Sequence, residues 1–206
     1  MEFWPELLTK ASWERLVLLK KEFKFILIGG WVAYLHTGLH KSKDIDIIVD
    51  YDVLKKLEQK YDLIKNNNLK KYEIKSGKFD IDIYVPYFSN LAIPLEDLSN
   101  QIIMIKGINT LGAEPLLILK QGAELDRRNS IKGEKDAIDI ITIILRSDIN
   151  WKTYTNLLKK YKKEKFKEEL TFIINNFSDK NIHYLEINFN EFKKWKKKII
   201  ESLKRL

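Results

Sequence analysis

The chain has 206 residues, of which 45% are apolar and 32% charged, and it contains no cysteine. This length and apolar content suffice for a folded domain with a real core and exclude a disordered chain. The lack of cysteine excludes disulfides, thiolate zinc sites and cysteine nucleophiles.

The first part of the chain alternates helices with short strands. Apolar periodicity and turn residues predict five elements up to residue 64 and a hairpin after it. We expect helices at 5–22, from Trp31 to Gly38 and at 51–64, strands at 23–30 and 44–50, and hairpin strands at about 69–75 and 79–85.

The second part is mainly helical. Residues 86–100 form a loop with two prolines, and 101–111 contain one or two short strands. Helices are expected at 114–126 and 131–146, followed by several basic helices. Early strands followed by late helices indicate an α+β sandwich with a helical tail. We therefore place a core domain at 1–112 and a helical region at 113–206, basic from about residue 151.

The net charge of +8 comes entirely from the tail. Residues 1–150 carry 22 basic and 22 acidic side chains, whereas residues 151–206 carry 15 and 7. The basic stripe of the tail is either a surface for the phosphates of RNA or DNA or an ordinary lysine-rich surface. The N-terminus does not resemble a secretory signal, and no apolar stretch is long enough to span a bilayer. We expect a cytoplasmic protein that does not contact a membrane.

Two of the expected strands carry aspartates at alternate positions. In "KDIDIIV" Asp44 and Asp46 point to the face opposite Ile45, Ile47 and Val49. In "KFDIDIYV" Asp80 and Asp82 share one face in the same way. Like charges on a half-buried surface repel each other and lose hydration, so something should compensate for them. Such carboxylates suit hard divalent cations, and three of them around two metals serve phosphoryl transfer. The alternative is a solvated strand face.

A glycine pair adds an independent signal. Gly29 and Gly30 lie between an expected strand and an expected helix, and thirteen residues separate them from the first aspartate pair. Backbone amides at a helix N-terminus can hold a phosphate, although a glycine pair alone is also typical of a tight turn. The glycines and both acidic strands together indicate phosphate chemistry.

This combination resembles the nucleotidyltransferase superfamily of DNA polymerase beta. The resemblance implies a small mixed sheet flanked by helices, a helical C-terminal region, and Mg²⁺ or Mn²⁺ as the cofactor. Asp44 and Asp46 match the paired metal ligands of the family. The third carboxylate, which also helps to activate the attacking hydroxyl, matches Asp82 or Asp80.

The nucleotide-binding positions follow from the same resemblance. Gly29 and Gly30 match the phosphate-binding turn. Many members carry "RxTxD" before the paired acids, and His40 and Ser42 occupy those places here, with Lys43 supplying charge nearby. Ser42 is therefore a candidate nucleotide contact.

Residues 111–145 are similar to the helical region of AbiEii-type nucleotidyltransferases, which are known as toxin components and as stand-alone proteins. Lys120, Arg127 and either Asp136 or Asp139 are the matching positions. Lys120 would contact the nucleotide phosphates as a point charge, and Arg127 or Arg128 would reach the same anion as a fork. Alternatively, Arg127 and Arg128 are solvated turn residues and Asp136 pairs with Lys132 on its own helix.

The resemblance implies an enzyme that transfers a nucleoside monophosphate from an NTP to a hydroxyl acceptor and releases pyrophosphate. The acceptor is a tRNA or other RNA end, a protein side chain or a small molecule, and a toxin or antitoxin partner protein fits the same picture. The alternative is a non-catalytic or antitoxin-like binding partner that uses the same fold. A nucleic-acid-binding module driven by the tail alone would leave the acidic strands unexplained.

Overall fold

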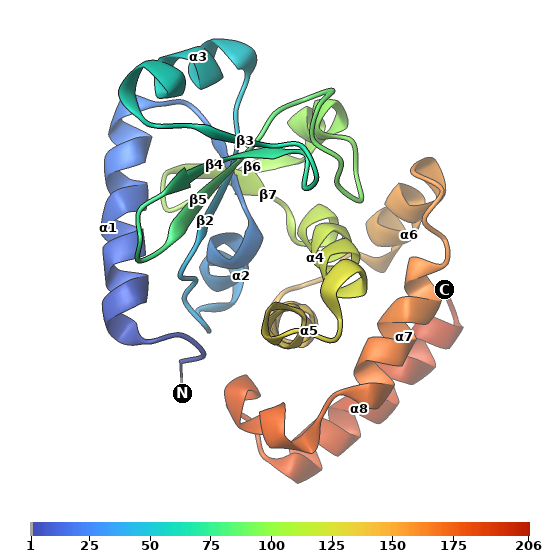
Figure 1. Ribbon diagram of the computed structural model, residues 1–206. Helices are drawn as coiled ribbons and strands as arrows, with labels where there is room; N and C mark the ends of the chain where they lie inside the picture. Colours follow the sequence, from blue (N-terminus) through green and yellow to red (C-terminus); the bar gives the residue numbers. More distant parts are fainter. Residues whose placement is uncertain (1) are drawn as a thin grey trace.

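The computed structural model describes residues 2–206 as an α+β protein, with a seven-stranded mixed sheet and a helical C-terminal half (Figure 1). The strands are β1 (Ile26–Ile28), β2 (Ile45–Ile48), β3 (Ile64–Asn66), β4 (Lys71–Lys75), β5 (Asp80–Tyr84), β6 (Ile102–Ile105) and β7 (Ile108–Leu111). The α-helices are α1 (Glu6–Glu22), α2 (Gly29–Thr37), α3 (Tyr51–Lys60), α4 (Ala113–Arg127), α5 (Ile131–Arg146), α6 (Trp151–Lys160), α7 (Phe166–Asn176) and α8 (Phe189–Lys204). Two 3₁₀ helices are η1 (Leu95–Gln101) and η2 (Asp179–Leu185).

The sheet places the two acidic strands side by side. Its strand order is β3-β4-β5-β2-β1-β7-β6. β2 runs parallel to β5 and antiparallel to β1, and β4 and β5 form an antiparallel hairpin. The register pairs Asp46 with Asp82, so these two carboxylates leave neighbouring strands at the same level. Directly opposed side chains on adjacent strands are close enough to interact.

Helices cover both faces of the sheet. Figure 1 shows α1 along one side of the sheet and the helices α4–α8 gathered on the other. Ile45 and Ile47 lie in a buried cluster with side chains of α1, α2 and α3. Ile48 points the other way and joins a second cluster built mainly from α4 to α8. Alternation along β2 therefore puts Asp46 on the face that the C-terminal helices cover.

Most of the elements expected from the sequence form, with local differences. α2 begins at Gly29 rather than at Trp31, and it ends at Thr37, followed by Gly38, whose left-handed φ of 75° makes it a glycine C-cap. The helix expected at 51–64 ends at Lys60, because the chain turns extended there and residues 64–66 pair with β4 as an edge strand. No helix within residues 2–206 has the length and apolar character needed to cross a membrane.

Candidate active site

Three of the four carboxylates that are candidate metal ligands reach one cavity between the sheet and the C-terminal helices. Asp44, Asp46 and Asp82 line it, together with Trp4, Gly30, Ser42, Lys43, Lys120, Arg127, Lys132, Lys135, Asp136 and Asp139. Asp80 is not among its lining residues, and its carboxylate binds Lys75 at the hairpin edge, with Oδ2 2.8 Å from Nζ. The backbone N–H of Asp80 instead donates to Oδ1 of Asp44, at 3.1 Å.

The glycine pair packs directly against the acidic strand. Gly29 has a φ of +73°, and a Cβ atom at this position would lie 2.2 Å from Oδ2 of Asp46. A Cβ atom at Gly30 would lie 2.7 Å from Oγ of Ser42. A residue with a side chain would therefore displace Asp46 or Ser42. The turn requires glycine for conformation at one position and for space at both.

The same turn leaves the N-terminus of α2 without a side-chain cap. Its N-cap residue, Ile28, makes no side-chain hydrogen bond to the first turn. The first N–H groups of a helix have no partner within the helix, and the helix dipole adds partial positive charge there. Ser42, which is buried and donates from Oγ to the carbonyl of Asp44 at 3.0 Å, forms the adjacent wall. This end of the cavity has the features of an anion subsite.

The opposite wall is a buried network of opposite charges between α4 and α5. Nζ of Lys120 lies 3.0 Å from Oδ1 of Asp136 and 2.7 Å from Oδ2 of Asp139. Arg127 donates from Nε to Oδ2 of Asp136 at 2.7 Å, and Lys135 binds Asp139. An ammonium has three N–H donors, so Lys120 retains one beyond these two carboxylates.

This network excludes one ion pair that the sequence left open on α5. Asp136 binds Lys120 and Arg127, and the pairing of Asp136 with Lys132 on its own helix is wrong. Nζ of Lys132 lies instead 3.2 Å from Oδ2 of Asp44, across the cavity. The neighbouring Arg128 faces away from the cavity and binds Glu124 and Glu169.

Lysines compensate part of the carboxylate repulsion. Lys132 forms an ion pair with Asp44. On β4, Nζ of Lys71 lies 2.6 Å from Oδ2 of Asp82 and 2.9 Å from Oε1 of Glu73. Oδ1 of Asp82 is buried and has no hydrogen-bond partner among residues 2–206. Burial raises the pKa of Asp82, against the opposing effect of Lys71. An unpaired buried carboxylate oxygen is costly and indicates a site for a cation or a proton donor.

Asp46 has a strongly raised pKa. It forms no ion pair among the described residues, and its Oδ1 accepts a long hydrogen bond of 3.5 Å from the hydroxyl of Tyr84. Burial, then the charge of Asp82, raises the pKa of Asp46 to about 7, with a smaller contribution from Asp44. Carboxylates with such a pKa in a cleft are typical of functional sites.

The carboxylates of the cavity are possible ligands for a metal ion. In residues 2–206 no group of three acidic or histidine side chains is assembled as a ready metal cluster. Magnesium, however, usually takes only one or two protein carboxylates together with substrate phosphates. The in-register pair of Asp46 and Asp82 supplies hard oxygen donors, one of which lacks a partner. The donor chemistry therefore fits Mg²⁺ or Mn²⁺ that arrives with a phosphate ligand.

The cavity itself is small. Its volume is about 60 Å³, well below the roughly 150 Å³ of an engineered apolar cavity that holds one benzene ring. It can hold phosphate oxygens, whereas a nucleoside would have to lie at its open mouth.

The sequence did not predict a place in or beside the cavity for four residues, namely Lys71, Lys132, Lys135 and Trp4. Only the tertiary structure brings these residues next to the aspartates, so no local pattern marks them.

Comparisons with known proteins yield distant likenesses. No protein-family model matches the chain, and neither does any curated protein. A structure described as a "putative nucleotidyltransferase" from Helicobacter pylori has 12% sequence identity and a TM-score of 0.49, with 98% of each chain covered. A second H. pylori structure, JHP933, has 16% identity and a TM-score of 0.42, again with 98% of each chain covered. At these values the function has to be argued from the residues of the cavity.

Proposed function

We propose that the chain is a metal-dependent nucleotidyltransferase that transfers a nucleoside monophosphate from an NTP to a hydroxyl acceptor. One observation carries the proposal: Asp44, Asp46 and Asp82 converge on one cavity beside the uncapped glycine turn of α2. An anion subsite next to clustered carboxylates suits a triphosphate that binds with dications. A solvated strand face would not need this arrangement.

The metal ligands in this proposal are Asp44, Asp46 and Asp82. Bound Mg²⁺ or Mn²⁺ would relieve the repulsion among these carboxylates and neutralise charge on the phosphates. We assign the third position to Asp82 rather than Asp80, because Asp80 lies outside the cavity and binds Lys75.

The chain's own groups then position the reactants. The N–H groups of the Gly29–Gly30 turn, Ser42, Lys120 and Arg127 hold the triphosphate. The free Oδ1 of Asp82 accepts the proton of the acceptor hydroxyl. A bond forms between the acceptor oxygen and the α-phosphorus, the bond from that phosphorus to the bridging oxygen breaks, and pyrophosphate leaves.

The direct test is incubation with Mg²⁺ and labelled NTPs, followed by mass spectrometry of added RNA and of the protein itself. We expect Asp46→Asn and Asp82→Asn to abolish transfer, and Asp80→Asn to retain it. Asp80 and Asp82 make a matched comparison, since both lie on β5 and both pair with a lysine. Transfer that survives in Asp46→Asn and Asp82→Asn would refute the assignment.

The acceptor class is the finer part of the proposal. Exposed lysines of α8, including Lys193, Lys194 and Lys197, support an RNA end, such as that of a tRNA, as the acceptor. RNA binding should then weaken steeply as salt rises, because counterions are released from the phosphates. Adduction of a co-expressed protein would indicate a protein acceptor instead. An AbiEii-like role with a toxin or antitoxin partner would appear as growth arrest relieved by a neighbouring gene.

A second candidate is a non-catalytic binding partner with this fold. The ion pairs of the cavity favour this non-catalytic role, because Lys132, Lys71 and Lys120 already neutralise carboxylates in or beside it. The two candidates differ in a thermal shift experiment. A ligand that binds the native state raises the melting temperature by mass action. Mg²⁺ with an NTP should raise it for the transferase and leave it unchanged for the non-catalytic protein.

A further inference from the structure

The cavity has one aromatic wall, and it comes from the N-terminal segment. Trp4 is the single aromatic side chain among the described residues that line the cavity, and it is half-buried. The other lining residues are charged or small. We propose that the indole ring of Trp4 is the platform on which the base of the nucleotide stacks. This inference rests on the proposed function and extends it to the base.

The size of the cavity supports separate places for the phosphates and the base of the nucleotide. A space of about 60 Å³ accepts phosphate oxygens but no purine or pyrimidine ring. The base of a nucleotide whose phosphates lie near Gly30 must therefore lie at the mouth. A flat apolar surface is what a base needs there, and Trp4 supplies it.

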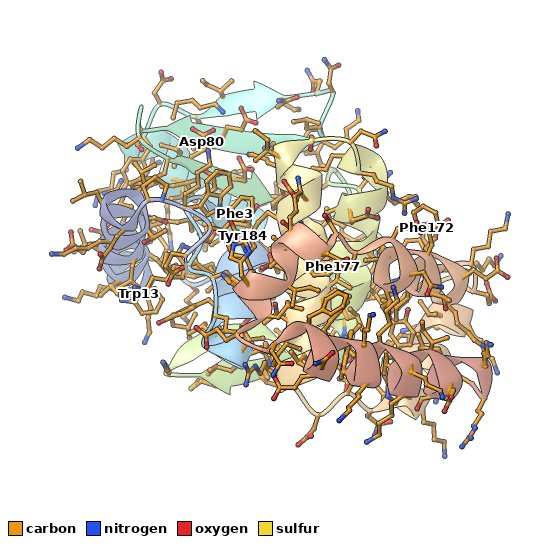
Figure 2. The ribbon with its side chains drawn as sticks, turned by 90° about the horizontal axis from the view of Figure 1, so that it is seen from below. Phe3, Trp13, Asp80, Phe172, Phe177 and Tyr184 are labelled. Carbon is orange, nitrogen blue, oxygen red and sulfur yellow. The ribbon has the colours of Figure 1, made fainter. Side chains whose placement is uncertain are left out.

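Contacts on both sides hold the N-terminal segment in place. Oε2 of Glu2 accepts a hydrogen bond from the backbone N–H of Lys41 at 2.9 Å. The ring of Phe3 lies 5.5 Å from that of Tyr184 in η2, and Figure 2 shows these two rings next to each other. The rings of Phe3 and Trp4 are 4.9 Å apart in an edge contact. The indole is thus pre-positioned, which lowers the entropy cost of stacking.

A lysine now covers one face of the indole. Nζ of Lys43 lies 4.8 Å from the centre of the Trp4 ring, and both residues line the cavity. An exposed cation–π contact is generally weaker than stacking of a base on an aromatic ring. We expect Lys43, a flexible side chain, to leave the ring for the phosphates when a nucleotide binds.

The other tryptophan near the glycine turn does not compete for this role. Trp31 is 1% exposed, and its indole N–H donates to Oγ of Ser12 at 2.9 Å. Its ring packs against Trp13 and Tyr34 in the core.

Stacking on Trp4 involves the face of the base and makes no hydrogen bond to its edge. We therefore expect nucleotides with all four bases to bind, with purines preferred because their rings overlap the indole over a larger area.

The test compares a nucleotide with its phosphates alone. Binding of ATP and of inorganic tripolyphosphate, each with Mg²⁺, is measured by calorimetry for the wild type and for Trp4→Ala. Loss of base stacking should weaken ATP binding about five- to 150-fold, with tripolyphosphate affinity unchanged. Trp4→Phe keeps an aromatic ring and should retain most ATP affinity, and Trp195→Phe on α8 serves as the control for loss of an indole elsewhere.

Fluorescence gives a second readout that needs no catalysis. ATP should quench tryptophan emission in the wild type, tripolyphosphate should not, and Trp4→Phe should lose the response. Equal weakening of both ligands in Trp4→Ala, or of neither, would overturn the platform without refuting the proposed function, because the wild type would still bind both ligands. Failure of the wild type to bind either ligand would overturn the proposed function and the platform with it.

Discussion

Replacing Asp46 with asparagine should stabilise the protein at neutral and alkaline pH while it abolishes transfer. The pKa of Asp46 is raised from 3.8 to about 7, chiefly by burial and then by Asp82. Between these values the native state binds more protons than the unfolded state. Stability from this group is therefore complete below pH 3.8 and is lost as the pH rises through about 7.

The magnitude follows from the size of this shift. At about 1.36 kcal/mol per pKa unit, a shift of about 3 units corresponds to at most about 4 kcal/mol. Asp46 is only half-buried, so water screens part of the cost, and we expect about 1–2 kcal/mol. Asparagine has nearly the same shape and removes the charge.

The assay is urea denaturation of the metal-free protein at pH 5 and pH 8.5. The wild type should lose stability between these pH values, and Asp46→Asn should lose less and be the more stable protein at pH 8.5. Asp62→Asn, which removes an exposed carboxylate after α3, controls for the change in net charge. An Asp46→Asn variant that is less stable than the wild type at pH 8.5 would show that the carboxylate is not under electrostatic strain.

Three further changes test the architecture of the cavity by the free energy of unfolding. Gly29→Ala should cost about 2 kcal/mol or more, from left-handed strain and the contact with Asp46, and Asp46→Ala in the same chain should restore part of it. Lys71→Met leaves Asp82 and Glu73 without their shared ammonium and should cost about 2–4 kcal/mol. As a control, replacement of the more exposed Lys75 by methionine should cost under about 1 kcal/mol. Lys120→Met should cost about 3–5 kcal/mol, because two buried carboxylates lose a partner, and a loss no larger than that of Lys75→Met would contradict a buried network.

Local patterns were sufficient for the elements and for the direction of the acidic side chains. Alternation along β2 correctly predicted that Ile45 and Ile47 lie opposite Asp46. Gly38 correctly marked the end of α2. These predictions succeed because a two-residue or a 3.6-residue period is a property of the backbone alone. The edge strand β3 was missed, since its short, largely exposed segment gains its stability from pairing with β4.

The tertiary structure decided the parts of the cavity that the sequence left open. The choice of Asp82 over Asp80 as the cavity residue depends on the register of β5 against β2. The partners of Asp136, and the approach of Lys132 to Asp44, depend on how α5 docks against the sheet. Trp4 reaches the cavity because Phe3 and Glu2 are held by residues far along the chain. Contacts between segments distant in sequence are set by packing and charge pairing, and no local period encodes them.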